Sequence, residues 1–462
     1  MKRVLLLAAV SAALLSACGG GGSGTAVSTP QASNTALQVN LGDAPADSLL
    51  AAGVTVNTLT LTSASGGSVS VMTTPRPMEM MQLMGTVAPL ALANVPQGTY
   101  SGATVTFGGA TMTFIDAASG QIIQRNAPGP MTANVTFDPA LVVGATPMVI
   151  NFDMDMAASV NIDASGNVSM APKLAVRMNP VVAGGRDPED GGMHGLVGMV
   201  GGVNGATFTL STAQGLTGMS LMTNSGTQFS GMAGMGMMGA NMLVAVDATP
   251  QADGTWMASA VQQRMSAGGA MGAGLVTDIV GNPPTQLTIV MRDGAGGGMM
   301  GSNLAGATTV NVGSGTQFAI DARNVDLSGL PFTPQFDRAN LAKGQSVDAW
   351  SSGQMMQGGG MGGMMGGGTL TAASIQLEEQ ALRGTVSGYS TNGTQASFTL
   401  TLPSDSAFAR LTGASAVTVY QQGNTQLRGL AAVANANTVQ VRGLLFVDSG
   451  GFRLVASRIV AG

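Results

Sequence analysis

Residues 54–61 read Val-Thr-Val-Asn-Thr-Leu-Thr-Leu, a run in which apolar side chains alternate with threonine and asparagine. Alternation of this kind is typical of a β-strand with one buried face. Similar short runs, bounded by turns rich in Gly, Asp and Pro, occur at residues 37–41, 104–107, 133–137 and 148–152. We therefore expect an all-β protein whose first folded unit, residues 36–178, is an antiparallel β-sandwich.

Two segments of this unit resemble a known family. Residues 37–49 (LQVNLGDAPADSL) contain a D-A-P-x-D turn, and residues 92–107 (LANVPQGTYSGATVTF) contain a P-x-G-x-Y turn that leads into a strand. Both turns are similar to those of an uncharacterised domain family found near the N-terminus of many bacterial lipoproteins. The matching positions are Asp43, Pro45, Asp47, Pro96, Gly98 and Tyr100. The resemblance implies a β-domain and brings no activity with it.

The start of the chain predicts export and a lipid anchor. Residues 1–18, MKRVLLLAAVSAALLSAC, begin with a basic segment, continue with an apolar run too short to span a membrane, and end in L-S-A-C, which resembles a lipobox. Cys18 is the only cysteine, and an exported protein rarely keeps an unpaired thiol without a use for it. We expect cleavage before Cys18, lipidation of that cysteine and a flexible tether over residues 19–35. Gly19, in place of Asp, favours the outer membrane. The alternative is an ordinary signal peptide with an incidental cysteine.

Charge and hydropathy exclude several classes of function. Beyond residue 18 the chain holds 16 Lys and Arg against 23 Asp and Glu, because Lys2 and Arg3 account for two of the 18 basic residues. No basic cluster is present in the sequence, so we expect no nucleic acid partner. No apolar stretch after Cys18 is long enough to span a membrane. We expect membrane contact through the N-terminal lipid, and partners among other envelope proteins.

After a Pro- and Gly-rich linker at residues 179–193, the chain repeats itself three times, over residues 194–267, 273–379 and 382–462. Five short blocks recur in the same order in each repeat. The repeats open with Gly195-Leu196-Val197, Gly274-Leu275-Val276 and Gly384-Thr385-Val386; they share a T-Q block at Thr227-Gln228, Thr316-Gln317 and Thr425-Gln426; and they close with residues 258–261, 372–375 and 456–459, of the pattern A-x-x-[VI]. Each repeat predicts a small five-stranded β-barrel, OB-like in its number of strands. Such repeats also resemble a second uncharacterised family of exported bacterial proteins.

Methionine is distributed unevenly along the chain. Residues 193–365 contain 20 methionines and residues 366–462 contain none. Many lie in Gly-rich inserts, including residues 231–238, and we expect them to be exposed because Gly-flanked loops bury side chains poorly. A separate cluster at residues 78–84 we expect to be core, as a short buried helix.

Exposed thioethers suggest a soft-metal site. Thioether sulfur suits Cu(I) or Ag(I), and in an up-and-down barrel the two inserts of the second repeat leave from one pole. The candidate ligands are Met299, Met300, Met355, Met356, Met361, Met364, Met365 and His194. The alternatives are flexible low-complexity spacers and an adaptable adhesive surface.

Nothing in the sequence predicts catalysis. His194 is the only histidine, and no nucleophile-elbow, zinc-protease or phosphate-loop motif occurs. Asp153 and Asp155 share one face of a strand and predict a solvated face, and the acidic residues at 187–190 predict a solubilising linker. Residues 163–167 (DASGN) carry half the pattern of a calcium loop and predict a hairpin turn. We expect no enzyme and a structural or binding role at the cell envelope, with copper(I) or silver(I) binding as the alternative.

Overall fold

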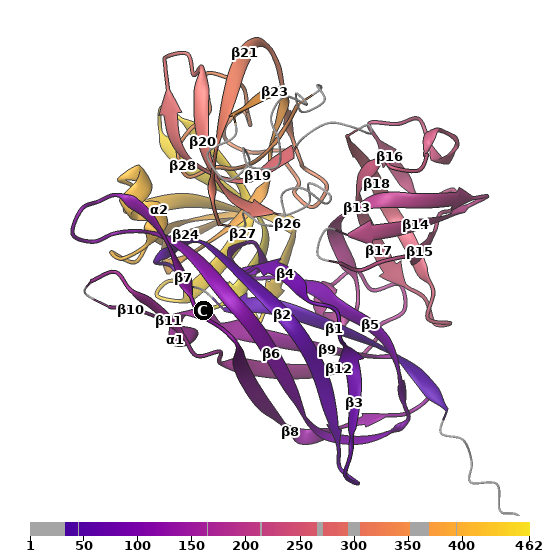
Figure 1. Cartoon of the computed structure of the whole chain (residues 1–462). Helices are drawn as coiled ribbons and strands as arrows, with labels where there is room; N and C mark the ends of the chain where they lie inside the picture. Colours follow the sequence, from indigo (N-terminus) through magenta and orange to yellow (C-terminus); the bar gives the residue numbers. More distant parts are fainter. Residues whose placement is uncertain are drawn as a thin grey trace, which may run out of the picture.

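The computed structural model describes residues 33–44, 46–163, 165–212, 215–265, 271–293, 305–351, 369–393 and 395–462. The described chain consists mostly of β-strands, which confirms the all-β expectation. Its helical elements are short: α1 (Met156–Ser159), α2 (Ala407–Thr412), and the 3-10 turns η1 (Met81–Leu83), η2 (Pro188–Asp190) and η3 (Met235–Met237). None of the described helices is long and apolar enough to cross a membrane. In Figure 1 the first domain fills the lower half of the view, and the three repeats lie above it.

The first domain is a sandwich of two sheets that share one hydrophobic core. One sheet has the strand order β12-β9-β1-β5, and the other has the order β3-β2-β6-β7, with β4 paired to β2 and β8 paired to β6. The strands are β1 (Asn34–Ala44), β2 (Leu49–Ser63), β3 (Ser68–Met72), β4 (Arg76–Glu79), β5 (Val87–Pro96), β6 (Gly98–Ile115), β7 (Ile122–Ala127), β8 (Met131–Val143), β9 (Met148–Asp155) and β12 (Leu174–Pro180), with a small hairpin of β10 (Val160–Ile162) and β11 (Val168–Met170). The pairing is antiparallel as expected, except that β1 and β9 run parallel.

Strand β2, which contains residues 54–61, shows how the sequence pattern becomes structure. Val54, Val56, Leu59 and Leu61 are buried, and the residues between them are partly exposed. Residues 57–58 are two consecutive polar residues, so strict alternation fails there. The register of β2 against β6 shifts at this point, and the resulting bulge returns the apolar side chains to the core face.

The two turns that carry the family resemblance, D-A-P-x-D and P-x-G-x-Y, have structural roles. Tyr100 is buried, and its hydroxyl donates a hydrogen bond to the carbonyl oxygen of Pro96 at 2.7 Å, an arrangement similar to the tyrosine corner of other sandwiches. Asp43 is buried on β1, and burial raises the pKa of its carboxyl group well above the ordinary value. Asp47 faces out of the domain and pairs with Arg383 of the third repeat at 3.2 Å. The P-x-G-x-Y turn therefore fixes a corner of the sandwich, and the D-A-P-x-D turn joins the sandwich to repeat 3.

Repeats 2 and 3 are closed five-stranded barrels. In both, the strands follow the order first, second, third, fifth, fourth around the barrel, and the third and fifth strands are parallel. The five-stranded barrels are therefore as expected, but they have the crossed-over connectivity of a Greek key, and the up-and-down reading used to place the Met inserts is wrong. The strands are β19 (Met271–Val280), β20 (Gln286–Asp293), β21 (Ala307–Ile320), β22 (Ser346–Trp350) and β23 (Thr369–Leu377) in repeat 2, and β24 (Glu379–Asn392), β25 (Gln395–Thr401), β26 (Ala416–Arg428), β27 (Thr438–Asp448) and β28 (Gly451–Ala461) in repeat 3.

Repeat 1 has the same order, but its third strand is in two pieces. Both pieces, β15 and β16, pair in parallel with the last strand, β18, so the sheet has six strands where five were expected. The break falls where a register shift interrupts the same parallel pairing in the other two repeats. The strands are β13 (Met193–Asn204), β14 (Thr207–Thr212), β15 (Met219–Met222), β16 (Gln228–Ser230), β17 (Leu243–Pro250) and β18 (Trp256–Met265).

A recurring threonine stabilises this interruption. In each repeat the hydroxyl of the T-Q block donates to the carbonyl oxygen of the alanine that begins the closing block. The pairs are Thr227 to Ala258 at 2.7 Å, Thr316 to Ala372 at 2.8 Å and Thr425 to Ala456 at 2.7 Å. The same hydroxyl oxygen accepts from the backbone N–H three residues earlier in all three repeats. One side chain thus replaces ladder hydrogen bonds where the two strands diverge, which explains why both blocks recur together.

The opening glycine of repeat 1 is Gly198, and the predicted opening at Gly195 is wrong. Gly198 pairs with the first residue of the V-x-V strand, as the opening glycines of repeats 2 and 3 do. A side-chain carbon at Gly198 would lie 2.7 Å from the carbonyl oxygen of Ser211. At Gly274 and Gly384 it would likewise collide with a carbonyl oxygen of the second strand. The close approach of two backbones therefore requires glycine at this position.

The described methionines contribute mainly to cores. All four methionines of the cluster at residues 78–84 are buried, as expected, and η1 forms the helical part of that cluster. In the Gly-rich insert of repeat 1, however, Met232 and Met238 are 9% and 7% exposed and belong to the core of the repeat. Met237 alone among the described residues of this insert is a largely exposed methionine, at 64%. The expectation that the glycines keep these side chains out of the core is wrong for repeat 1.

Candidate binding site at the junction of the domains

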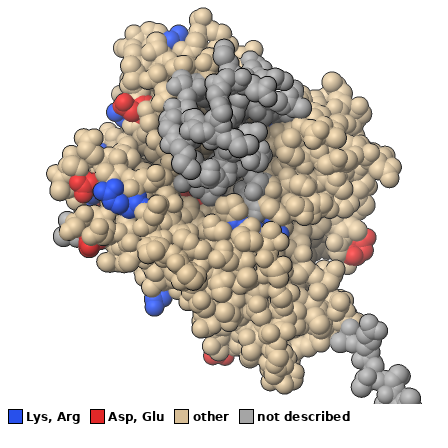
Figure 2. Space-filling view, viewed as in Figure 1, with Lys and Arg blue, Asp and Glu red and all other residues tan. Residues whose placement is uncertain are grey.

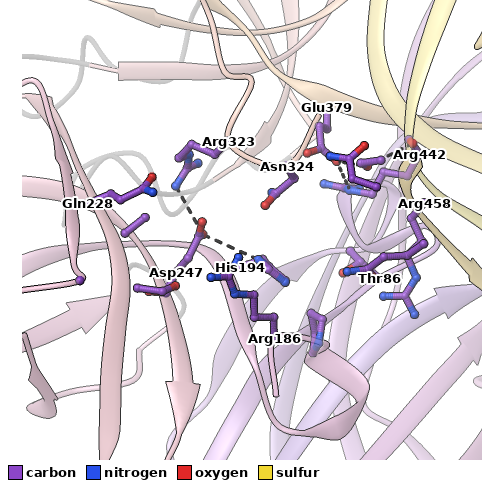
Figure 3. A pocket seen from close by; sticks show the side chains of 17 residues that line it. Thr86, Arg186, His194, Gln228, Asp247, Arg323, Asn324, Glu379, Arg442 and Arg458 are labelled. Atoms are coloured by element: carbon purple, nitrogen blue, oxygen red, sulfur yellow. Dashed lines mark hydrogen bonds and ion pairs between the residues drawn. The ribbon is translucent and has the colours of Figure 1, made fainter. Parts of the chain in front are cut away.

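Four folded units meet around one polar cavity of about 300 Å³ (Figure 3). Its wall includes residues of the first domain, the linker and all three repeats. A second cavity of about 190 Å³ shares part of this wall. The titratable side chains in the wall of the first cavity are Arg186, His194, Asp247, Arg323, Glu379, Arg442 and Arg458. Charged side chains are sparse on the face of the molecule shown in Figure 2, so this concentration is a distinctive feature of the structure.

Repeats 1 and 3 present the same edge to the cavity. Gln228 of β16 and Ser259 of β18 line it from repeat 1, and Gln426 of β26 and Ser457 of β28 line it from repeat 3. These are equivalent positions of the T-Q block and of the closing block. The blocks that recur in the sequence therefore build two walls of the cavity from one pattern.

His194, at the start of β13, lies against Asp247 of β17. Its Nδ1 is 3.9 Å from Oδ1 of Asp247, and burial lowers the pKa of the imidazole. The same carboxylate oxygen accepts a hydrogen bond from the backbone N–H of Gly195 at 2.6 Å and lies 3.4 Å from Nη1 of Arg323 in repeat 2. Asp247 is therefore held between two repeats, and the imidazole is favoured in its neutral form.

Glu379 and Arg442 of repeat 3 form another part of the wall. Oε2 of Glu379 accepts a hydrogen bond from the hydroxyl of Ser457 at 2.7 Å and lies 3.4 Å from Nε of Arg442. Nη1 of Arg442 donates to the carbonyl oxygen of Gln82 in the first domain at 2.9 Å. Arg442 therefore joins the first domain to repeat 3 beside the cavity.

The acidic residues of the linker are docking residues, so the expectation that they merely solubilise it is wrong. Asp187 is buried and forms ion pairs with Arg428 and Arg458 of repeat 3. Oε1 of Glu189 lies 2.7 Å from Nη2 of Arg458, and Asp190 lies 3.4 Å from Arg428. These pairs hold the linker against repeat 3 and place its neighbouring residues in the cavity wall.

Other predicted polar features behave more simply. Asp163 accepts hydrogen bonds from the backbone N–H groups of Ser165 and Asn167, which confirms the hairpin turn. Asp155 is exposed and caps α1, as a solvated residue can, whereas Asp153 is partly buried and burial raises its pKa.

The second cavity is lined by a buried ion network between repeats 1 and 2. The side chain of Arg264, at the end of β18, is 2% exposed, and its guanidinium lies 2.6 Å from Glu378, 2.9 Å from Asp321 and 3.4 Å from Asp348. Burial raises the pKa of Glu378 well above its usual range and raises that of Asp348, against the opposing effect of Arg264. The guanidinium carbon also lies 5.6 Å from the ring centre of Trp350. The guanidinium group of Arg264 thus lies within ion-pair distance of three carboxyl groups that have little access to water.

The residues predicted for lipidation and metal binding lie largely outside the described part of the chain. This holds for Cys18 and for all seven candidate methionines of repeat 2. His194 is described, and it belongs to the junction cavity. Within the described ranges, no group of three or more His, Cys, Asp or Glu residues is placed to hold a metal ion.

The strands that flank the two inserts of repeat 2 do end at one pole of the barrel. β20 ends at Asp293 and β22 ends at Trp350, and both strands run antiparallel to β19, which lies between them. The shared pole was expected from an up-and-down barrel, and it arises here in a Greek-key barrel.

Sequence reasoning missed the four arginines of the cavity. They lie at positions 186, 323, 442 and 458, the first in the linker, the second in repeat 2 and the last two in repeat 3, so no short motif connects them. The sequence signal that could have indicated them is the small number of arginines: only 14 follow residue 18, and four of these line this one cavity.

Comparison with known families identifies the first domain only at a coarse level. Residues 34–172 match the family described as Domain of unknown function (DUF4382). The match covers most of the sandwich and supports the resemblance to an uncharacterised N-terminal domain. It ends before the linker and the repeats, so of the titratable residues of the cavity it contains none. No curated protein is similar to the chain.

Proposed function

We propose that the protein is a lipid-anchored binding protein of the bacterial cell envelope, attached through Cys18 and without catalytic activity. The binding role rests on one observation, the polar cavity whose wall is assembled from all the folded units. The anchor rests on the lipobox-like sequence at residues 15–18.

The fixed geometry of the junction supports a binding role. The first domain is held to repeat 3 by the pair Asp47–Arg383, and repeat 1 is held to repeat 2 by Arg264. The linker is held to repeat 3 by Arg458. A cavity wall fixed before the ligand arrives loses less conformational entropy on binding, which favours affinity.

The state of the cavity hydroxyls supports binding over catalysis. A nucleophilic hydroxyl donates its hydrogen bond to an available base. Ser259 instead donates to the backbone carbonyl of Asp247 at 3.2 Å. Ser457 donates to Glu379, whose negative charge Arg442 already offsets. The Nδ1 atom of His194 has no hydrogen-bond partner in the described structure.

The anchor is tested by expressing the full chain in a bacterial host with labelled palmitate. The wild type should carry the label and sediment with membranes. Cys18→Ser should lose the label and appear in the soluble fraction after export, while the tether variant Ser23→Ala should behave as the wild type. A Cys18→Ser protein that still takes up label would exclude this anchor.

The alternative function is binding of Cu(I) or Ag(I) by the Met/Gly inserts of repeat 2. The favouring observation is that the flanking strands β20 and β22 end at the same pole. Titration of Cu(I) against a competing chelator should then give submicromolar binding that is lost when the seven insert methionines are replaced by leucine. Met237→Leu, in repeat 1, is the matched control. Weaker binding, or binding indifferent to the seven replacements, would exclude the alternative.

A further inference from the structure

The wall of the junction cavity offers more hydrogen-bond donors than acceptors. Four arginines line it against two carboxylates, and the amides of Gln228 and Gln426 add further N–H groups. Both carboxylates already accept from the protein: Asp247 from Gly195 and Glu379 from Ser457. The two anionic acceptors of the wall are therefore engaged by the protein, and positive charge exceeds negative charge in the wall.

The arginines of the wall differ in how fully they are paired. Arg323 and Arg458 also face Asp321 and Glu189, which hold their guanidinium groups in place. Arg186 is exposed and forms no ion pair within the described residues, although it lines the cavity. Its charge is therefore available to a ligand.

The size and lining of the cavity restrict the ligand class. The volume of about 300 Å³ is at the small end of ligand pockets. Among the described residues that line it, only Pro188, Ala260 and Gly226 are apolar, and none is Phe, Tyr or Trp. An apolar ligand or a sugar stacked on an aromatic ring has no complementary surface in such a wall.

We propose that this cavity binds a small oxyanion, a carboxylate or a phosphate, with Arg186 as the accessible charge and Gln228 and Gln426 as amide donors from the matching edges of repeats 1 and 3. The inference rests on the proposed binding function and specifies its ligand class. Guanidinium groups bind both kinds of oxyanion through paired N–H donors, so the two ligands share one recognition chemistry.

The test uses the full chain in detergent and isothermal titration with inorganic phosphate, citrate and succinate, with sodium chloride at matched ionic strength as the reference. At least one oxyanion should bind, and it should raise the Tm with increasing concentration, as a ligand of the folded state does. Arg186→Gln should weaken binding at least tenfold, and Gln228→Ala with Gln426→Ala should weaken it further. Arg125→Gln, an exposed arginine on β7 far from the wall in sequence, should leave it unchanged.

Each outcome has a definite meaning. Binding of phosphate but not of citrate or succinate assigns a tetrahedral anion, and the reverse assigns a carboxylate. Absence of binding by all three, or binding that Arg186→Gln and the glutamine variants leave unchanged in proteins with wild-type Tm, overturns the proposal. Palmitate labelling reports on the anchor independently, so failure of the oxyanion site is distinguishable from failure of the lipoprotein assignment.

Discussion

Arg264 provides a direct test of how repeats 1 and 2 are joined. Arg264→Met keeps much of the apolar length of the side chain and removes the charge shared by Asp321, Asp348 and Glu378. Removing one partner from a buried ion pair typically costs about 3–5 kcal/mol, because a charge is left buried without compensation. We expect the free energy of unfolding to fall by about 4 kcal/mol at pH 8.

The size of this loss should depend on pH. Burial already raises the pKa of Glu378 and Asp348, and removal of Arg264 raises the folded-state values further. A folded-state pKa above the unfolded value contributes stability below the unfolded pKa, and this stability disappears as the pH rises through the folded pKa. The difference between Arg264→Met and the wild type should therefore be smaller at pH 5 than at pH 8.

Urea denaturation of the full chain, followed by tryptophan fluorescence, measures both effects, since Trp350 lies beside Arg264. Arg177→Met is the control, because the side chain of Arg177 is 65% exposed in its pair with Glu189 and such pairs contribute below about 1 kcal/mol. A loss below about 1 kcal/mol for Arg264→Met, or a loss equal at pH 5 and pH 8, would refute the assignment of a buried network.

Three further predictions concern single residues. Burial raises the pKa of Glu79 to about 7 from an ordinary value of 4.5. The contribution of Glu79 to stability should therefore decline by about 3 kcal/mol as the pH rises from 4 to 8, and the stability of the wild type relative to Glu79→Gln should fall by that amount in urea titrations. Thr425→Val should lower the free energy of unfolding by about 1–3 kcal/mol through loss of its two backbone hydrogen bonds, while exposed Thr399→Val should change it by less than about 0.5 kcal/mol; equal effects would contradict the role of the T-Q block. Gly384→Ala should lower the Tm by several degrees because its side chain meets a backbone carbonyl, whereas Gly144→Ala, with open space around it, should not; circular dichroism melting curves decide.

The fold could be predicted from the sequence as far as local patterns reach. Alternation in residues 54–61 predicted a strand, and recurrence of five blocks predicted three similar small barrels, of which repeats 2 and 3 are closed and five-stranded while repeat 1 is a six-stranded sheet. The parallel pairing of third and fifth strands could not be predicted, because it joins segments that are distant in sequence and depends on a threonine hydroxyl that no alternation pattern reveals. The opening of repeat 1 was misplaced for a related reason: Gly195 and Gly198 look equivalent in sequence, and only the backbone contact at Gly198 separates them.

The junction cavity could not be predicted from the sequence, because its wall forms only when the sandwich, the linker and the three repeats pack together. Arg186 and Arg458 acquire their roles from neighbours on other units, such as the acidic linker residues that a single sequence presents as surface charge. His194 was the one predicted site residue that lies in the wall, and it was selected for a different ligand chemistry.

The contact between Asp47 and Arg383 has a consequence for how the molecule assembles. The two residues are 336 positions apart, and the carbonyl oxygen of Asp47 also accepts from the backbone N–H of Ala407 at 2.6 Å. Synthesis runs from the N-terminus, so the sandwich can form its own core long before repeat 3 emerges. The turn that contains Asp47 and the acidic residues of the linker both pair with arginines of repeat 3, which is synthesised last. A nonsense mutation just before β24 would therefore delete one barrel and would also leave these acidic residues of the sandwich and the linker without their positively charged partners.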